Sequence, residues 1–264
     1  MMKAILFDLD GVIYQGEQAL PGAHRTLAWV RQQRIPHLYL TNTTSRPRSH
    51  ITRKLARLGM SVPEREILTP PVAARSWLQD HGVCRLALFL PEATQAEFAG
   101  IEILGPERDS GADAVVLGDL GDGWSFARLN RAFRLLMTQP HPYLIALGMT
   151  RYWRAPDGLR LDTAPFVVAL AHASGVEPVV LGKPARPFFA AALKALGTEP
   201  GETLMIGDDI RGDIGGSQSA GLPALLVRTG KFRQEDLHGD IRPDGVIDTI
   251  GDLPAWWRAH APAG

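Results

Sequence analysis

The sequence predicts an α/β protein built on parallel strands, with a second, smaller α/β domain inserted into the first. Short apolar runs alternate with segments of helical periodicity along the chain, which is the order of strands and crossover helices in a parallel sheet. Acidic residues also follow apolar runs near both ends of the sequence, beginning at Asp8 and at Asp208. These acids make chemical sense only together, so we expect the two ends to form one domain around an insertion.

The first part of the chain begins this series. Leu27, Val30 and Arg31 recur at helical spacing, and a second helix is expected to begin after Pro47 and to end at Gly59. Strands are expected within AILFD and PHLYLTN, and helices within GAHRTLAWVRQQR and PRSHITRKLARLG. The next stretch, ILTPPVAARSWLQDHG, is expected to begin with a short strand and to continue as a helix.

The last part of the chain repeats the order. PARPFFAAALKALG predicts a helix that ends at Gly197, and ETLMIGDD predicts a strand that ends in acids. A helix within IRGDIGGSQSAG, a strand within PALLVRTG, and a final strand and helix within DGVIDTIGDLPAWWRAHA follow. We therefore assign residues 1–82 and 180–264 to the outer domain.

The middle of the chain, residues 83–179, has its own series and is assigned to the inserted domain. Its patterns are CRLALFL, EATQAEFAG, ADAVVLGD, SFARLNRAFRLLM, YLIAL and LDTAPFVVALAHASG. A hairpin is expected at residues 148–161, where Arg151, Tyr152, Trp153 and Arg154 alternate cations with aromatic rings. This segment is either an edge strand protected by polar side chains or a surface that contacts the substrate.

Composition excludes several classes of function. The 28 basic and 28 acidic residues balance, so no strong field favours nucleic acid or an anionic membrane. The single cysteine, Cys84, excludes an internal disulfide and a site of several thiolates. The chain enters its first strand with no room for a signal peptide, and its apolar runs are too short to span a membrane. We expect a soluble cytoplasmic protein.

Four groups of polar residues stand at strand ends or helix starts. In open α/β sheets, ligands bind at the carboxyl ends of the strands. Several carboxylates cannot share a pocket with a phosphate group unless positive charge is present, and Mg²⁺ prefers such oxygen ligands. The groups are Asp8 with Asp10; Thr41 with Asn42; Lys183; and Asp208, Asp209 and Asp213.

Each group is ambiguous alone. A D-x-D-G run also occurs in turns and calcium loops, and Thr41 with Asn42 also fits a helix cap. Lys183 by itself could be a solvated lysine before a helix that starts with proline. Arg46 is a further candidate, for a second phosphate or a carboxylate.

As an ordered set, FDLDGV, LTNT, GKP and IGDDIRGD resemble the haloacid dehalogenase-like (HAD) phosphatases, specifically subfamily IIA with its α/β cap. MIGDDIRGDIGGSQSAG with VRTGKFR is similar to the branch that contains the phospholysine phosphohistidine inorganic pyrophosphate phosphatases. The resemblance implies a Rossmann-like HAD core with a parallel sheet. It also implies that residues 83–179 are a cap that sets substrate specificity and that often pairs two subunits.

The resemblance also implies roles for the acids. Asp8 would attack phosphorus and form an aspartyl-phosphate. Asp10 would protonate the leaving oxygen and then deprotonate water. The carboxylates of Asp8 and Asp208, with the backbone carbonyl of Asp10, would hold Mg²⁺. An intact Asp10 favours phosphate-ester chemistry, since family members that cleave carbon–halogen bonds lack this acid.

The other residues would hold the phosphoryl group or support the site. Thr41, the backbone N–H of Asn42 and Lys183 would bind the transferring group. Asp209 and Asp213 would orient the waters on the metal or Lys183.

The sequence thus predicts a Mg²⁺-dependent phosphatase that acts on a small phosphorylated molecule. One alternative is a phosphoacceptor signalling module, although receiver domains are shorter, lack an inserted domain, and place their acid pair and phosphoacceptor on different strands. Another is a regulatory protein that binds phosphorylated metabolites without turnover. The sequence leaves the leaving group open, and also whether two copies pair as a homodimer through the cap.

Overall fold

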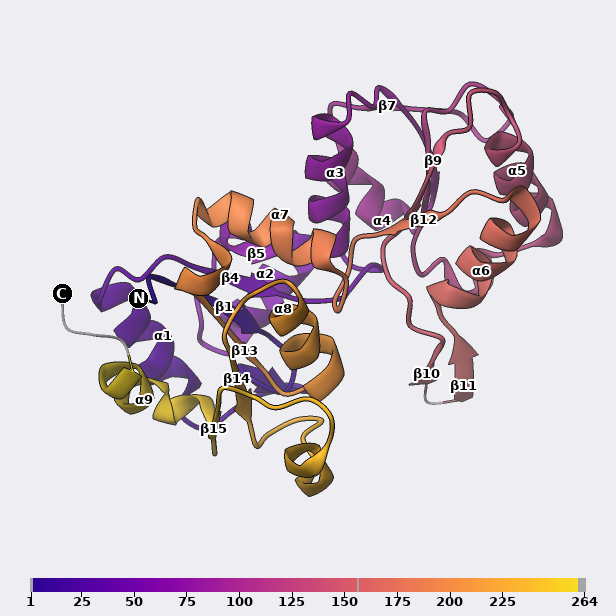
Figure 1. The fold of residues 1–264 in the computed structure, drawn as a ribbon. Helices are drawn as coiled ribbons and strands as arrows, with labels where there is room; N and C mark the ends of the chain where they lie inside the picture. Colours follow the sequence, from indigo (N-terminus) through magenta and orange to yellow (C-terminus); the bar gives the residue numbers. More distant parts are fainter. Residues whose placement is uncertain (1, 156, 261–264) are drawn as a thin grey trace. The chain divides into compact units, whose positions relative to one another are not determined.

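The computed structural model describes residues 2–155 and 157–260, and the chain forms two compact units (Figure 1). The first unit comprises residues 1–41, 48–68 and 183–264, and the second comprises residues 42–47 and 69–182. The second unit is therefore inserted into the chain of the first. Both units contain parallel sheets, and the predicted fold class is confirmed.

The first unit is built on a six-stranded parallel sheet in the order β15-β14-β13-β1-β4-β5. From β1 the chain adds strands in one direction, and from β13 it adds them in the other. The sheet thus has its topological switch point between β1 and β13, where open α/β sheets bind ligands. The strands are β1 (Ala4–Asp8), β4 (His37–Leu40), β5 (Ile67–Leu68), β13 (Thr203–Gly207), β14 (Ala224–Val227) and β15 (Gly245–Ile247).

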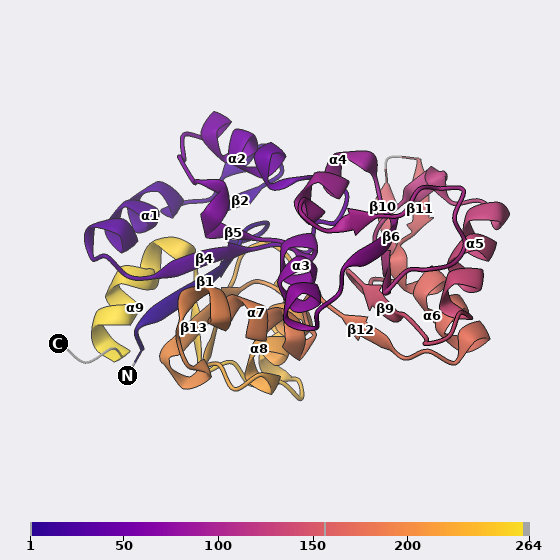
Figure 2. The same cartoon turned by 90° about the horizontal axis from the view of Figure 1, so that it is seen from above.

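Helices cover both faces of this sheet, which explains why the central strands are continuous apolar runs. Phe7 and Ile206 belong to a buried cluster that also takes in residues of α1, α2 and α9, and the Phe7 ring stacks on Tyr39 with centroids 5.7 Å apart. Figure 2 shows α1 and α2 on one side of the sheet and α7 and α8 on the other. The helices are α1 (Ala23–Gln32), α2 (Arg48–Arg57), α7 (Arg186–Leu196), α8 (Gly216–Ser219) and α9 (Leu253–His260).

The second unit has a five-stranded parallel sheet in the order β12-β9-β8-β6-β7. One apolar cluster joins the sheet to α5 and α6, and another joins its opposite face to α3 and the turn after α4. The elements are α3 (Pro70–Asp80), β6 (Arg85–Phe89), α4 (Glu92–Gln95), β7 (Glu102–Ile103), β8 (Ala114–Leu117), α5 (Phe126–Leu136), β9 (Tyr143–Ala146), α6 (Thr163–Ser174) and β12 (Pro178–Val180).

The observed start of the insertion differs from the expected one. We expected the insertion at residues 83–179, but α3 already belongs to the second unit. Ala74 and Leu78 of α3 lie in the same buried cluster as Leu86 and Ile145 of the second sheet. The pattern of a helix after a strand does not reveal which of two sheets the helix covers, so sequence alone misplaced this boundary.

The hairpin expected at residues 148–161 is present. β10 (Tyr152–Ala155) pairs antiparallel with β11 (Gly158–Leu161) in a two-stranded ribbon of its own, so it is not an edge strand of the five-stranded sheet. Another short hairpin, β2 (Tyr14–Gln15) with β3 (Gln18–Ala19), follows β1.

Short helical turns complete the described chain. They are η1 (Glu64–Glu66), η2 (Ala96–Phe98), η3 (Gly121–Gly123), η4 (Pro200–Glu202), η5 (Ile210–Gly215), η6 (Gln234–His238) and η7 (Ile250–Asp252), of which η5 is a π-helix. Within residues 2–155 and 157–260, every helix is too short or too polar to cross a bilayer.

The packing of α5 yields a stability prediction. Leu135 is fully buried against the second sheet, whereas Met137, at the end of the same helix, is 47% exposed. Leu135→Ala should lower the free energy of unfolding by about 2–5 kcal/mol, because it removes buried methyl groups and leaves a cavity. Met137→Ala should change it by less than about 0.5 kcal/mol. Urea unfolding followed by circular dichroism measures both; equal effects would contradict the packing described.

Candidate active site

Polar residues gather at one edge of the first unit's sheet because three adjacent strands end there. Asp8 is the last residue of β1, Asp208 directly follows β13, and Thr41 directly follows β4. The strand register aligns these ends, since Phe7 lies opposite Ile206 and Asp8 lies opposite Leu40. The site thus stands at the switch point of the sheet.

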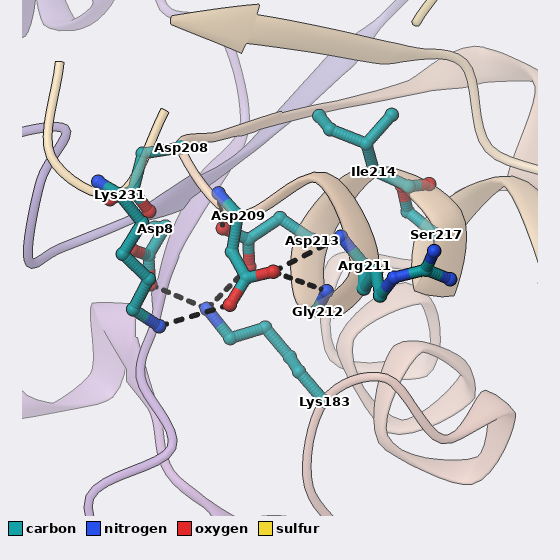
Figure 3. Close-up of polar contacts among 10 residues, drawn as sticks. All are labelled: Asp8, Lys183, Asp208, Asp209, Arg211, Gly212, Asp213, Ile214, Ser217 and Lys231. Atoms are coloured by element: carbon teal, nitrogen blue, oxygen red, sulfur yellow. Dashed lines mark hydrogen bonds and ion pairs between the residues drawn. The ribbon is translucent and has the colours of Figure 1, made fainter. Parts of the chain in front are cut away.

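Three buried carboxylates form the centre of the site. Asp8, Asp208 and Asp213 each offer one oxygen, and these oxygens all lie within 4.8 Å of one another. Asp213 comes from η5, the π-helix that follows β13. Figure 3 shows the side chains converging from β1, from the end of β13 and from η5.

A buried lysine joins two of these acids. The Lys183 ammonium lies 2.5 Å from Asp8 Oδ1 and 2.7 Å from Asp213 Oδ1 (Figure 3). Lys183 precedes α7 in the sequence, so this contact ties residues far apart in the chain. Burial alone would lower the pKa of Lys183, but the charges of Asp213 and Asp8 outweigh it and hold that pKa above its usual value. The lysine therefore remains charged.

One ammonium does not balance three carboxylates. Burial raises the pKa of Asp8 to about 8, opposed by Lys183 and reinforced by Asp213 and Asp208. Burial also raises the pKa of Asp208 to about 6, although a backbone N–H bond from Lys231 opposes the rise. Both shifts report the cost of collecting anions away from water. The site is therefore short of positive charge.

One carboxylate oxygen at this site has no partner among the described residues. Asp208 Oδ2 accepts a hydrogen bond from the Lys231 backbone N–H at 2.7 Å, whereas Asp208 Oδ1 is buried and accepts none. A buried acceptor left unpaired is costly. Hard oxygen donors with an excess of negative charge suit a divalent cation. The residues present thus fit a divalent metal ion.

The remaining predicted acids of the first unit take different positions. Asp10 is exposed in the turn after β1 and forms an isolated bridge with Tyr14. Asp209 caps η5, accepting hydrogen bonds from the backbone of Arg211 at 3.0 Å and of Gly212 at 2.8 Å. Its carboxylate therefore organises the start of the helix that carries Asp213.

The predicted phosphate-binding residues divide between the two units. Thr41 is buried in the first unit, and its backbone N–H donates to the carbonyl of Leu68 at 3.3 Å. Asn42 and Arg46 are exposed and belong to the second unit.

The turn after β14 was not predicted to belong to the site. Lys231 contacts two of the acids, through its backbone N–H to Asp208 and through its ammonium, 3.0 Å from Asp209 Oδ2. Thr229 donates its hydroxyl to the carbonyl of Gly11 at 2.5 Å. The signal was available, since RTGK directly follows β14 of the same sheet, but the contact to Asp208 is made by a backbone N–H, which side-chain chemistry does not reveal.

The second unit has a cavity of about 480 Å³ beside the β10–β11 hairpin. Trp153 and Arg160 of the hairpin line it, together with Phe166 of α6 and Asp119. Burial raises the pKa of Asp119, and the charge of Asp162 adds to the rise. The hairpin thus contributes an aromatic ring and a cation to a pocket that also holds an acid.

Sequence comparisons identify the family. One family model, described as haloacid dehalogenase-like hydrolase, matches residues 5–103, and a second, described as HAD-hydrolase-like, matches residues 180–253. The human phospholysine phosphohistidine inorganic pyrophosphate phosphatase is 36% identical over 98% of this chain and 96% of its own. The bovine haloacid dehalogenase-like hydrolase domain-containing protein 2 is 38% identical over 89% of this chain and 87% of its own.

Solved structures of phosphatases have the same fold as this chain. A p-nitrophenyl phosphatase from Archaeoglobus fulgidus superimposes with a TM-score of 0.86 at 25% identity, covering 97% of this chain and 99% of its own. A 4-nitrophenylphosphatase from Thermotoga maritima gives a TM-score of 0.84 at 25% identity, covering 96% and 97%. The predicted class of enzyme, a phosphatase-type hydrolase, is confirmed by these relatives, and the chain belongs to the haloacid dehalogenase-like hydrolases.

Proposed function

We propose that the protein is a Mg²⁺-dependent phosphatase that hydrolyses a small phosphorylated molecule through an aspartyl-phosphate on Asp8. The buried cluster of Asp8, Asp208, Asp213 and Lys183 carries this proposal. At the switch point of the sheet, Asp8 can act as the nucleophile and Lys183 supplies an oriented positive charge. Asp208 Oδ1, which has no hydrogen-bond partner among the described residues, is available to bind a metal ion. Membership of the hydrolase family supports the same conclusion.

Asp8 acts as the nucleophile. Lys183 holds Asp8 Oδ1 at 2.5 Å, which fixes the carboxylate plane and leaves Oδ2 to attack phosphorus in line with the leaving oxygen. The bond to the leaving group breaks as the acyl-phosphate bond forms. Attack by water on phosphorus then releases inorganic phosphate and regenerates Asp8, so that one difficult hydrolysis becomes two easier steps.

Asp10 moves the protons. Its exposed position in the turn after β1 suits a group that meets the substrate and solvent. As an acid it protonates the leaving oxygen in the first step. As a carboxylate it removes a proton from the attacking water in the second step.

The remaining residues hold charge in place. The Asp8 and Asp208 carboxylates and the Asp10 carbonyl would bind Mg²⁺, which when present offsets the repulsion between Asp8 and the phosphoryl group. The Thr41 hydroxyl, the Asn42 backbone N–H and Lys183 bind the phosphoryl oxygens. Asp213 keeps Lys183 charged and oriented from 2.7 Å.

The second unit is proposed to select the substrate. Relatives named for phospholysine, phosphohistidine and inorganic pyrophosphate support a small phosphate ester, phosphoamide or diphosphate. Residues 148–161 and Arg46 remain candidates to contact the leaving group, and the hairpin's place beside a cavity favours that role for residues 148–161. A homodimer through the second unit and a cytoplasmic location stay predictions.

The alternatives predict no turnover. A phosphoacceptor module would become phosphorylated without rapid release of phosphate, and a binding protein would do neither. Family membership favours the enzyme over both.

Removal of the nucleophile tests the mechanism. Asp8→Asn should lower kcat for p-nitrophenyl phosphate by at least about 10³-fold, because an amide oxygen cannot form the acyl-phosphate. Wild-type activity should also vanish in EDTA and return with Mg²⁺. The matched control is Asp248→Asn, which alters an exposed acid 3.1 Å from Arg228. Release of p-nitrophenolate is the measurement, with circular dichroism to check folding. A kcat of Asp8→Asn equal to that of the wild type would contradict the mechanism.

The raised acid pKa values predict how stability depends on pH without metal. The pKa of Asp8 is about 8 and that of Asp208 about 6 in the folded protein, against 3.8 for an unperturbed Asp. The folded state thus binds these protons more tightly, and its stability falls as pH rises through this range. In EDTA, Asp8→Asn should therefore become more stable relative to wild type between pH 5 and pH 9, as measured by urea unfolding.

Mg²⁺ should shrink this difference at the upper pH, since a cation stabilises the ionised carboxylates of the wild-type protein. Asp248→Asn again serves as the control, because its side chain is 76% exposed. A difference between Asp8→Asn and wild type that stays constant, or reverses, as pH rises would contradict the charge imbalance.

A further inference from the structure

The turn Thr229–Lys231 joins the two acid-bearing strand ends of the first unit. The Thr229 hydroxyl donates to the Gly11 carbonyl at 2.5 Å, and the Lys231 backbone N–H donates to Asp208 Oδ2 at 2.7 Å. Gly11 directly follows Asp10, and Asp208 directly follows β13. The turn therefore contacts both the segment that carries the proton-transfer group and the carboxylate with the unpaired oxygen.

Close backbone packing makes this junction rigid. Gly11 has φ +87° and Gly230 has φ +63°, both in the left-handed region that favours glycine. A Cβ atom on either glycine would lie 2.0 Å from Asp208 Oδ2, and one on Gly230 would lie 2.6 Å from the Gly11 Cα. Two glycine backbones thus enclose the same carboxylate oxygen.

The turn gives the two carboxylate oxygens of Asp208 different surroundings. Oδ2 is enclosed by glycines and bonded to the Lys231 N–H, whereas Oδ1 is buried with no hydrogen-bond partner in the described chain. A bond that satisfies one oxygen fixes the rotation of the carboxylate and leaves the other oxygen for a cation. Partners of this kind orient metal ligands.

The backbone of Lys231 matters more here than its ammonium. The ammonium pairs with Asp209 Oδ2 at 3.0 Å, but the lysine side chain is 71% exposed. Exposed ion pairs contribute little. The N–H bond to Asp208 is part-buried and its acceptor carboxylate is buried, so water competes with it less than with the ammonium contact.

We propose that the Thr229–Gly230–Lys231 turn positions Asp208 for metal binding and locks it to the Gly11 turn beside Asp10. This inference rests on the proposed metal-dependent function. Its residues act through Asp208 and the Gly11 turn, so they are positioning residues and do not touch the substrate.

Two glycine variants test the turn. Gly230→Ala should weaken Mn²⁺ binding to the substrate-free protein by about ten-fold or more, because the methyl group displaces Asp208 Oδ2. Gly197→Ala is the matched control: Gly197 has φ +66° at the end of α7, and a Cβ there would meet nothing within 4 Å. It carries similar backbone strain and should bind Mn²⁺ like the wild type. Electron paramagnetic resonance of free Mn²⁺ gives the affinities, and thermal unfolding in EDTA gives the stabilities.

A second pair covers the case in which Gly230→Ala fails to fold. Thr229→Val removes the hydroxyl at nearly constant volume, and Thr229→Ser keeps it. Thr229→Val should weaken Mn²⁺ binding several-fold and lower kcat with little change in the substrate KM at saturating Mg²⁺, whereas Thr229→Ser should restore both. A turn needed only for stability would lower the unfolding temperature without this pattern.

The outcomes separate the turn from the metal site. If the wild type binds Mn²⁺ and folded Gly230→Ala or Thr229→Val binds it equally well, the positioning role is overturned while the proposed function stands. If the wild type binds no Mn²⁺, the metal site and the positioning role both fall. Loss of affinity in Gly230→Ala and Thr229→Val, but not in Gly197→Ala or Thr229→Ser, establishes the role.

Discussion

The site depends on the ammonium of Lys183, buried between Asp8 and Asp213 at 2.5 and 2.7 Å. This pair of contacts brings β1, the segment before α7 and η5 together, and it sets the electrostatics of the whole sheet edge. With Asp208 beside them, the three carboxylates exceed the single ammonium, so burial and mutual repulsion raise the pKa of Asp8 and of Asp208. Buried ion pairs of this kind are weak sources of stability. Their arrangement is better explained by chemistry, because buried carboxylates that exceed the available positive charge suit a divalent cation.

The scaffold supplies the order that such a site requires. Fully buried parallel strands hold their carboxyl ends in register, and the reversal of strand order at β1 and β13 opens space for a ligand. The glycines at positions 11 and 230 then let two backbones approach one carboxylate, which no residue with a Cβ permits in this geometry. The sheet fixes the positions of Asp8 and Asp208, and loops add Asp10, the proposed proton-transfer group, and the turn whose Lys231 N–H bonds to Asp208.

Much of this was predictable from sequence. Continuous apolar runs that end in acids predicted β1 and β13, and the rule that parallel strands end at one edge accounts for the meeting of Asp8 and Asp208. Asp213 reaches them from η5 and Lys183 from the segment before α7. The boundary of the insertion was misplaced because α3 follows β5 like any crossover helix, and only packing shows that it covers the second sheet. The contact of Lys231 with Asp208 was missed because every residue except proline has a backbone N–H, so the residue type does not indicate where that group will bond. The capping of η5 by Asp209 could not be predicted either, because an acid that follows a strand can bind a metal ion or cap a helix equally well.

The central claim is that one divalent cation binds between the acids of β1 and β13. A crystal of the protein soaked in Mn²⁺, with diffraction measured near the manganese absorption edge, tests it directly. The account predicts an anomalous peak about 2.0–2.3 Å from oxygens of Asp8 and Asp208, in the octahedral oxygen environment typical of such ions. A fully soaked crystal with no peak there, or with manganese bound only at other acids, would contradict it.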